Sequence, residues 1–249
     1  MPLSLVFSLC IAILGTAILS GIFGMAGGMI LMGVMAWLLP VPAAMILHGV
    51  TQTASNGYRA FLHSAHIHWG VLTGYLVGVA LAVSIFLIAD FVPNTATVLI
   101  TLGSFPFIAA AIPKRFALDM MRPGTPIICG LAVTVCQLIA GVSGPVLDIF
   151  YVNSALTRHQ IVATKAITQV IGHVIKLVYY GFIVGTLLNG EVDNIPWYMF
   201  AAAILLAMTG TTIGKQVLDR MSDHNFRLWS QRLLMVVGLI FIGRGLMLL

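Results

Sequence analysis

Charged residues are scarce in this sequence, at 8% of 249 residues, whereas soluble domains carry about 25%. Hydrophobic residues make up 60% of the chain, and the mean hydropathy is +1.06. Too few polar side chains are present to cover a water-exposed surface, so a soluble protein is excluded. We predict an integral membrane protein whose apolar runs cross the bilayer as helices, because a helix satisfies its own backbone hydrogen bonds.

Acidic residues are the rarest charged group, since seven Asp and Glu stand against twelve Lys and Arg. The bases lie in short loops and inside apolar segments, which favours a role in membrane orientation over a nucleic-acid partner. Carboxylates are too few for a Na⁺ or Ca²⁺ site to be favoured. The three cysteines, Cys10, Cys129 and Cys136, all fall in apolar segments and predict packing residues rather than disulfides.

Other absences narrow the function further. No Lys or Arg precedes the first apolar run, so a secretory signal peptide is not expected. No ATP-binding motif is found, so transport would draw on ion or substrate gradients, and no cofactor is expected. The stretch HSAHIHW holds His63, His66 and His68, for which interfacial histidines are favoured over a metal site.

Ten apolar segments are predicted as helices. They cover roughly 3–22, 27–39, 43–63, 69–90, 95–112, 125–140, 145–155, 159–187, 196–217 and 226–248. The second and seventh are too short to span a bilayer, which takes about 20 residues. Each directly follows a glycine-rich break, GIFGMAGG or AGVSGP, so each is predicted to form a broken or re-entrant hairpin with the segment before it. The fold class is an all-α polytopic membrane protein.

The sequence repeats itself weakly with a fixed shift of 117 positions. In that frame Gly27 falls on Gly144 and Gln52 on Gln169, so glycine breaks and polar helix positions agree without a gap. Each half has five predicted segments, and an odd number makes the second half enter from the opposite side. We therefore predict inverted repeats, an architecture typical of secondary transporters. The predicted units are a first repeat at 1–112, a cytoplasmic linker at 113–124 and a second repeat at 125–249.

Loop charges predict the orientation. Lys and Arg gather in the loops on one side of the membrane: Lys114, Arg115, Arg122, Arg158, Arg220 and Arg227. The loops on the other side contain no Lys or Arg and carry Glu191 and Asp193. By the positive-inside rule the first side is cytoplasmic, so both termini are predicted to lie outside.

Two apolar segments carry a row of polar side chains, in the stretches HGVTQTASNGYR and KAITQVIGHVIK. The rows are His48, Gln52, Asn56 and Arg59 in the first, and Lys165, Gln169, His173 and Lys176 in the second. Spacings of four, four and three place each row on one helix face. An ionisable residue inside the bilayer costs several kcal/mol unless it faces a cavity or a partner, so the two faces are predicted to meet at a polar site.

The chemistry of these rows favours an anion, because bases and amide donors dominate. The second arms of the two hairpins add free backbone N–H groups near Gly27, Gly28, Gly144 and Pro145, where the helix dipole also attracts negative charge. Since a bound anion stabilises the charged form of a lysine, proton-coupled transport is compatible with this sequence.

Plainer explanations stay open for several of these residues. Arg59 and Lys165 lie near helix ends, from which long side chains reach the membrane surface. His48 and His173 are also compatible with packed, hydrogen-bonded histidines. The hairpin glycines are equally expected where helices approach closely, as are the GxxxG pairs Gly74–Gly78 and Gly210–Gly214.

The stretch GVSG, residues 141–144, matches the GxSG serine motif of rhomboid intramembrane proteases, so a protease is a further alternative. Ser143 would need His159 or His173 as a base. The first repeat has Ala26 where Ser143 stands, so the repeat explains the glycines without a protease.

The two glycine motifs, GIFGMAGGMI and AGVSGPVLDI, each followed about twenty residues later by a polar helix with Gln52 or Gln169, resemble the TauE/SafE family of sulfite and organosulfonate exporters. The resemblance covers almost the whole chain. It implies a bacterial inner-membrane transporter that exports a small sulfur oxyanion or a C2 sulfonate, such as sulfite or sulfoacetate. The usual family motif is richer in glycine than the copies here, which carry Met29, Pro145 and Asp148.

The sequence as a whole predicts a secondary transporter of a small anion, working by alternating access between two repeats. Bases would supply charge to the substrate: His48, Arg59, Lys165 and Lys176. Hydrogen-bond donors would be Gln52, Asn56, Gln169 and His173, and the hairpin residues would shape the helix ends. A passive anion channel of the same fold is the alternative. Oligomeric state is not predicted.

Overall fold

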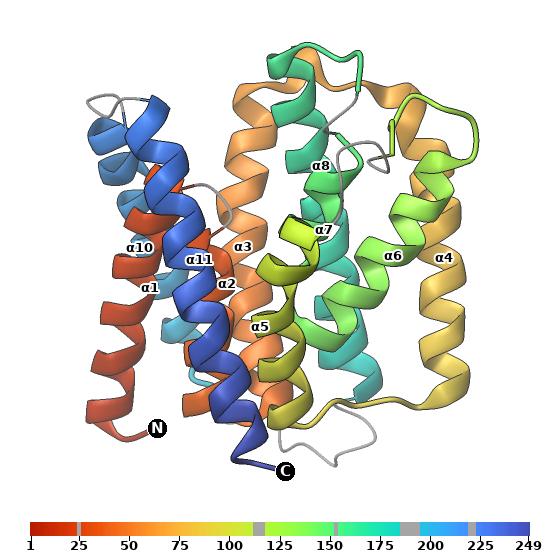
Figure 1. Ribbon diagram of the computed structural model, residues 1–249. Coiled ribbons are helices and arrows are strands. Elements are labelled where there is room, and N and C mark those ends of the chain that lie inside the picture. The colour runs from red at the N-terminus through yellow and green to blue at the C-terminus, as the bar shows by residue number, and fades with distance from the viewer. Residues whose placement is uncertain (24–25, 112–117, 152–153, 185–194, 219–222) are drawn as a thin grey trace.

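The computed structural model describes residues 1–23, 26–111, 118–151, 154–184, 195–218 and 223–249. This part of the chain folds into ten α-helices with short 3-10 and π-helical turns and no strand, which confirms the all-α class (Figure 1). The helices are α1 (Leu3–Phe23), α2 (Ala26–Leu38), α3 (Val41–Leu62), α4 (Leu72–Ala89), α5 (Thr95–Ala111), α6 (Thr125–Ala140), α7 (Gly144–Ile149), α8 (Arg158–Val178), α10 (Trp197–Leu218) and α11 (Asp223–Leu246).

Membrane-spanning length is reached by four apolar stretches: Leu3–Ile22, Trp69–Ala89, His159–Val184 and Trp197–Gly214. Three shorter apolar helices accompany them, namely α2, α5 and α6. Large apolar side chains point outward, as at Ile88 and Phe182, which are 85% and 72% exposed. This outward apolar surface is what a bilayer requires, so the protein is a multi-pass membrane protein.

The seventh helix is shorter than predicted, since α7 ends at Ile149 rather than at 155. Phe150 closes it with 3-10-type backbone bonds, and its carbonyl accepts a hydrogen bond from Met120 N at 2.9 Å. That bond ties the exit of α7 to the segment that enters α6, so α6 and α7 form a hairpin. The eighth predicted segment continues beyond α8 as a π-helical turn, η4 (Tyr179–Val184), and its predicted end at 187 lies outside the described residues.

The break between α6 and α7 depends on Gly141. Its φ of +73° lies in the left-handed region, and an added Cβ would meet the sulfur atoms of Met32 and Met45 at 2.5 and 2.8 Å. Only glycine fits such a position without strain. Pro145 then occupies the first turn of α7, where no backbone N–H is needed.

The first hairpin is made by α1 and α2, although residues 24–25 between them lie outside the described part. Gly27 lies directly against the backbone of α1, because a Cβ there would be 2.1 Å from Thr16 O and 2.5 Å from Ser20 N. The chain therefore turns back after Phe23, and α2 packs along α1. Gly27 therefore serves close helix packing, the plainer of the two explanations for the hairpin glycines.

Glycines also set the pairing of the outer helices. An added Cβ on Gly214 of α10 would be 2.3 Å from Ile18 O of α1, and one on Gly78 of α4 would be 2.0 Å from Ile127 O of α6. Gly103 of α5 lies equally close to the backbone of Gly238 in α11. The prediction that the GxxxG glycines allow close packing is confirmed at Gly78 and Gly214.

At the centre, α3 and α8 cross in antiparallel directions (Figure 1). Leu177 fills the space beside Gly49, and Val170 is the nearest side chain beside Gly57, so residue numbers fall along α8 as they rise along α3. Both chain termini lie at the same end of the molecule (Figure 1).

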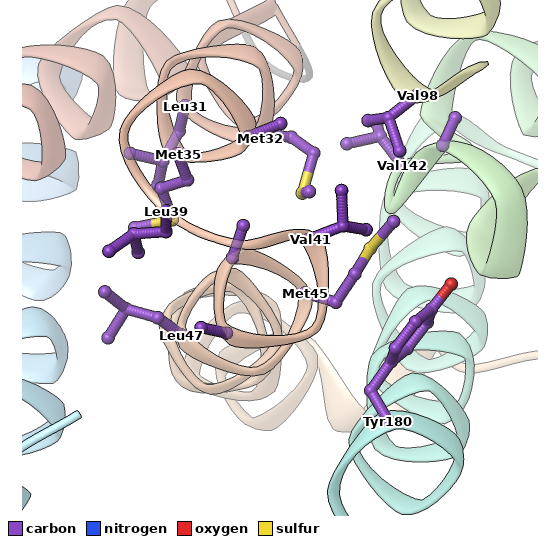
Figure 2. Close-up of a cluster of buried hydrophobic side chains, with 14 of the residues drawn as sticks. Leu31, Met32, Met35, Leu39, Val41, Met45, Leu47, Val98, Val142 and Tyr180 are labelled. Carbon is purple, nitrogen blue, oxygen red and sulfur yellow. The ribbon is translucent and has the colours of Figure 1, made fainter. Parts of the chain in front are cut away.

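An apolar cluster fills the space between α2, α3 and the residues after Gly141. Figure 2 shows Met32 and Met45 extending from these two helices towards Val142, with Tyr180 nearby. The two methionines are fully buried. Methionine fills irregular gaps because its side chain is unbranched and flexible, which suits the uneven space beside the α6–α7 break.

Candidate functional site

A polar cavity lies between the two halves of the chain. Its walls come from α1, α2, α3, the α6–α7 break and α8: Ser20, Gly28, His48, Gln52, Asn56, Arg59, Val142, Ser143, Gln169 and His173. Seven of the twelve residues predicted from sequence are on this wall. The structure therefore brings together the whole first row, half of the second row and one hairpin residue, Gly28.

The cavity is narrow. The volume that the centre of a water molecule can occupy in it is about 20 Å³, which is room for roughly one water molecule. An anion of four or more heavy atoms does not fit into this space.

The polar rows reach the cavity because each row occupies one face of a well-formed helix. α3 starts directly after Pro40 with Pro42 in its first turn, and α8 starts with a capping box in which Thr157 and Gln160 satisfy each other's backbone N–H groups. Helices set this way carry residues at spacings of four along one face. Gln52, Asn56, Gln169 and His173 consequently face the same space.

His48 is fixed at both ring nitrogens. Its Nε2 lies 2.9 Å from Gly28 O, and because a carbonyl only accepts, Nε2 must carry the proton. Nδ1 then accepts from Lys176 Nζ at 2.9 Å. His48 is thus a neutral, fully hydrogen-bonded histidine on the cavity wall.

Lys176 is fully buried behind His48 and does not line the cavity. Besides His48 Nδ1, its ammonium donates to Gly141 O at 2.9 Å. A charge buried this deeply is stabilised only by hydrogen bonds and nearby dipoles, since no carboxylate is recorded within ion-pair distance of it among the described residues. Through His48 and Gly28, the side chain joins α2 to Gly141 in the α6–α7 break.

Lys165 forms an ion pair with Asp148 of α7 and is absent from the cavity wall. The side chains of Lys165 and Asp148 are 21% and 44% exposed, so the pair lies at the edge of the interior. Since α8 begins seven residues earlier, Lys165 sits about 10 Å into the helix. The structure thus places its ammonium on an acidic partner in the second hairpin.

Arg59 lines the cavity and is half-buried. Lys165–Asp148 is the one ion pair recorded in the described part of the chain, so Arg59 has no carboxylate there to neutralise it. The charges of Arg59 and Lys165 repel each other. This end of the cavity is therefore electropositive, and an anion there would relieve the repulsion.

The amides complete the wall. Gly28 lets Gln52 approach α2, because a Cβ on Gly28 would be 3.3 Å from Gln52 Nε2. Gln52 Oε1 also accepts a long hydrogen bond, 3.5 Å, from Asn56 Nδ2. With its oxygen turned to Asn56, Gln52 keeps its NH₂ group as a donor for the cavity.

Two residues important to this site escaped the sequence-based prediction, Ser20 and Gln137. Ser20 lines the cavity, and Gln137 holds the α6–α7 break from behind it. A signal for both was present: the shift of 117 that pairs Gln52 with Gln169 also pairs Ser20 with Gln137. Each lies four residues before a break glycine, Gly24 or Gly141.

The remaining predicted residues of the second hairpin, Gly144 and Pro145, are buried in α7 and are not on the cavity wall. Ser143 is on the wall, but its hydroxyl donates to Gln137 Oε1 at 2.7 Å rather than to a histidine. The Ser–His bond that a serine nucleophile requires is not formed between Ser143 and His173. This arrangement gives no support to a protease.

The stretch with His63, His66 and His68 is the alternative candidate for a metal site. No group of three metal-binding side chains is found within the described ranges. The ring of His66 lies beside that of His159, with centroids 5.3 Å apart, and both residues are exposed.

These features define the class: a multi-pass helical membrane protein with a polar cavity enclosed between broken helices, as in membrane transporters. The family model for the sulfite exporter TauE/SafE matches residues 9–241, nearly the whole chain, so the chain belongs to the TauE/SafE family, a family of transporters. Searches of curated proteins and of solved structures gave no match.

Proposed function

We propose that this protein is a secondary transporter that exports a small sulfur-containing anion, sulfite or a C2 sulfonate such as sulfoacetate, across the bacterial inner membrane. The observation that carries the proposal is the cavity itself, which is rich in hydrogen-bond donors and has no carboxylate on its wall. Sulfonate and sulfite oxygens only accept hydrogen bonds, so amide N–H groups and a guanidinium match them.

The charge around the cavity supports the same substrate class. Arg59 supplies one positive charge on the wall, and Lys176 behind His48 would supply a second when a bound anion keeps it protonated. Lys165 is neutralised by Asp148. A cavity with this excess of positive charge favours an anion of charge −1 or −2, because low-dielectric surroundings strengthen the attraction.

Alternating access requires two halves that can move relative to each other, and we propose that these are inverted repeats related through 117 positions. The helix pairs support this relation. α1 packs on α10 and α4 packs on α6, and an exchange of the first five helices with the last five interchanges these two pairs. The same exchange returns α3 with α8, and α5 with α11, to themselves.

The cavity size supports alternating access over a passive channel. A channel needs a continuous path, whereas the space here holds about one water molecule. The methionines beside Gly141 are fully buried and pack against the α6–α7 break. Movement of a hairpin would open it, and coupling to protons is compatible with the buried Lys176.

The test is uptake into proteoliposomes that contain the purified protein, with sulfite, sulfoacetate, taurine, sulfate and thiosulfate compared with and without a pH gradient. We expect saturable uptake of one sulfur anion, and faster uptake when the same anion is loaded inside. Counterflow of this kind distinguishes a transporter from a channel.

Gln169→Ala is the matching variant, and we expect it to reduce uptake about tenfold or more, because it removes an amide from the wall. Gln216→Ala is the control, since Gln216 is an exposed glutamine on α10. If no sulfur anion competes for a site that Gln169→Ala removes, the anion assignment fails.

A further inference from the structure

The side chain of Gln137 in α6 makes three hydrogen bonds inside the protein. Its Nε2 lies 3.1 Å from Gly141 O and 2.8 Å from His173 Nδ1, and its Oε1 accepts from Ser143 Oγ at 2.7 Å. Gln137 is 1% exposed, so every polar atom of this amide is buried and satisfied. The amide therefore fixes the break after α6 and the Nδ1 edge of the His173 ring at the same time.

These contacts decide which nitrogen of His173 carries the proton. Gly141 O can only accept, so the amide atom beside it must be the NH₂ group of Gln137. The second hydrogen of that group points to His173 Nδ1, which must then be the unprotonated nitrogen. In a neutral imidazole the proton is therefore on Nε2.

Nε2 is the nitrogen of His173 that remains for the cavity. His173 lines the cavity, and its Nδ1 is turned towards Gln137. No residue in the described ranges is recorded within hydrogen-bond distance of Nε2. The neighbouring ring of His48, with centroids 5.5 Å apart, is already bonded at both nitrogens.

We propose that Gln137 is a positioning residue that holds His173 as a neutral N–H donor, with Nε2–H directed at an oxygen of the bound anion. The identity of that anion rests on the proposed function above, whereas the tautomer does not. A donor held in this way pairs best with an oxygen that carries no hydrogen, and it offers no acceptor to the hydrogen of a hydroxyl. Gln137 thereby favours fully deprotonated sulfonate or sulfite oxygens over protonated oxyanions of similar size.

The first experiment measures the tautomer by ¹⁵N NMR of the purified full-length protein with labelled histidine, in which the signal lost in His173→Gln assigns His173. We expect Nε2 to be protonated and Nδ1 to be unprotonated. In Gln137→Glu, a carboxylate replaces the donor with little change in shape, and we expect the proton to move to Nδ1. Ser143→Ala is the control for the tautomer, because Ser143 bonds only the amide oxygen.

A protonated Nδ1 in the wild-type protein would overturn the proposal, even if Gln137→Glu does not fold. The proposal is also overturned if Gln137→Glu folds and Nδ1 stays unprotonated. These readings do not depend on which anion is transported.

The second experiment measures sulfite and sulfoacetate affinity of the same proteins. We expect Gln137→Glu to weaken binding by about tenfold to a hundredfold, the range for a lost hydrogen bond to a charged group, while Gln216→Ala has no effect. If the tautomer changes and the affinity does not, the positioning role is wrong. If the wild-type protein binds neither anion but shows the expected tautomer, the proposed substrate is wrong and the role of Gln137 in fixing His173 stands.

Discussion

At the scale of single residues, Lys176 is a costly side chain to bury. Its ammonium is fully buried, and its recorded partners are His48 Nδ1 and Gly141 O. An isolated charge inside a membrane protein costs several kcal/mol. A residue retained at such a cost is expected to serve function rather than stability.

Lys176→Met tests this expectation, because methionine has a similar length and no charge. Gly141 O keeps its bond from Gln137, so the loss of Lys176 leaves one buried acceptor unsatisfied, His48 Nδ1, at a cost of about 1–3 kcal/mol. The relief of the buried charge is larger. We expect the thermal unfolding temperature in detergent to stay the same or rise, and uptake to fall about tenfold or more. A large loss of stability with normal uptake per folded molecule would contradict this.

Arg59 gives a second prediction at this scale. If its guanidinium binds the anion, Arg59→Gln weakens binding by about tenfold to a hundredfold, since a charge-assisted hydrogen bond is lost. Arg59→Lys keeps the charge and should lose less. Isothermal titration with the transported anion measures both. Equal affinities in the wild-type and both variant proteins would show that Arg59 only reaches towards the membrane surface.

Much of the site could be predicted from sequence, because polar residues inside an apolar helix must face a cavity or a polar partner. Gln52, Asn56, Gln169 and His173 all reach the cavity as their helical spacing implies. The positions of Lys165 and Lys176 could not be predicted in the same way. Spacing fixes the helix face, but a lysine has four rotatable bonds and chooses among partners, here Asp148 and the His48–Gly141 pair.

At the scale of helices, the pairing of α4 with α6 rests on Gly78. An added Cβ would lie 2.0 Å from Ile127 O, and backbone cannot move aside as a flexible side chain can. We expect Gly78→Ala to destabilise the protein by about 1–3 kcal/mol, as overpacked interiors do. Thermal unfolding of the purified protein in detergent measures the loss.

Gly15→Ala is the matched control, since nothing lies within 4 Å of a Cβ added there. Both glycines are inside helices of spanning length, so replacing either one with alanine raises helix propensity by a similar amount. Gly15→Ala should leave stability unchanged or slightly higher. A similar response of the two variants would mean that α4 and α6 are not in backbone contact at Gly78.

The observed helix ends lie close to those predicted from sequence, because glycine, proline or a fall in hydropathy marks them. The exception is α7, which stops at Ile149 although apolar residues continue to Tyr151. Tertiary bonding ends it, since the Phe150 carbonyl bonds to Met120 instead of continuing the helix. A contact with a residue thirty positions away leaves no local pattern, so it could not be predicted.

At the scale of the whole molecule, the two termini lie at one end, and the segment at 118–124 before α6 lies at the other (Figure 1). The loop charges predict that the termini face outwards. We expect Met247→Cys to be labelled by a membrane-impermeant maleimide in intact cells and Met121→Cys only after permeabilisation. Both positions are exposed, at 79% and 39%. The background would be a protein with its three native cysteines replaced. The reverse labelling pattern would invert the assigned orientation.

The bonds of Lys176 have a mechanical consequence. Gly28 and Gly141, far apart in the sequence, are held at a fixed separation through His48 and one ammonium group. Each bond in this link is 2.9 Å long, and a stretch of about half an ångström weakens such a bond severely. Separation of the two hairpins would require the loss of at least one of these bonds, so we expect the link to act as a latch between them.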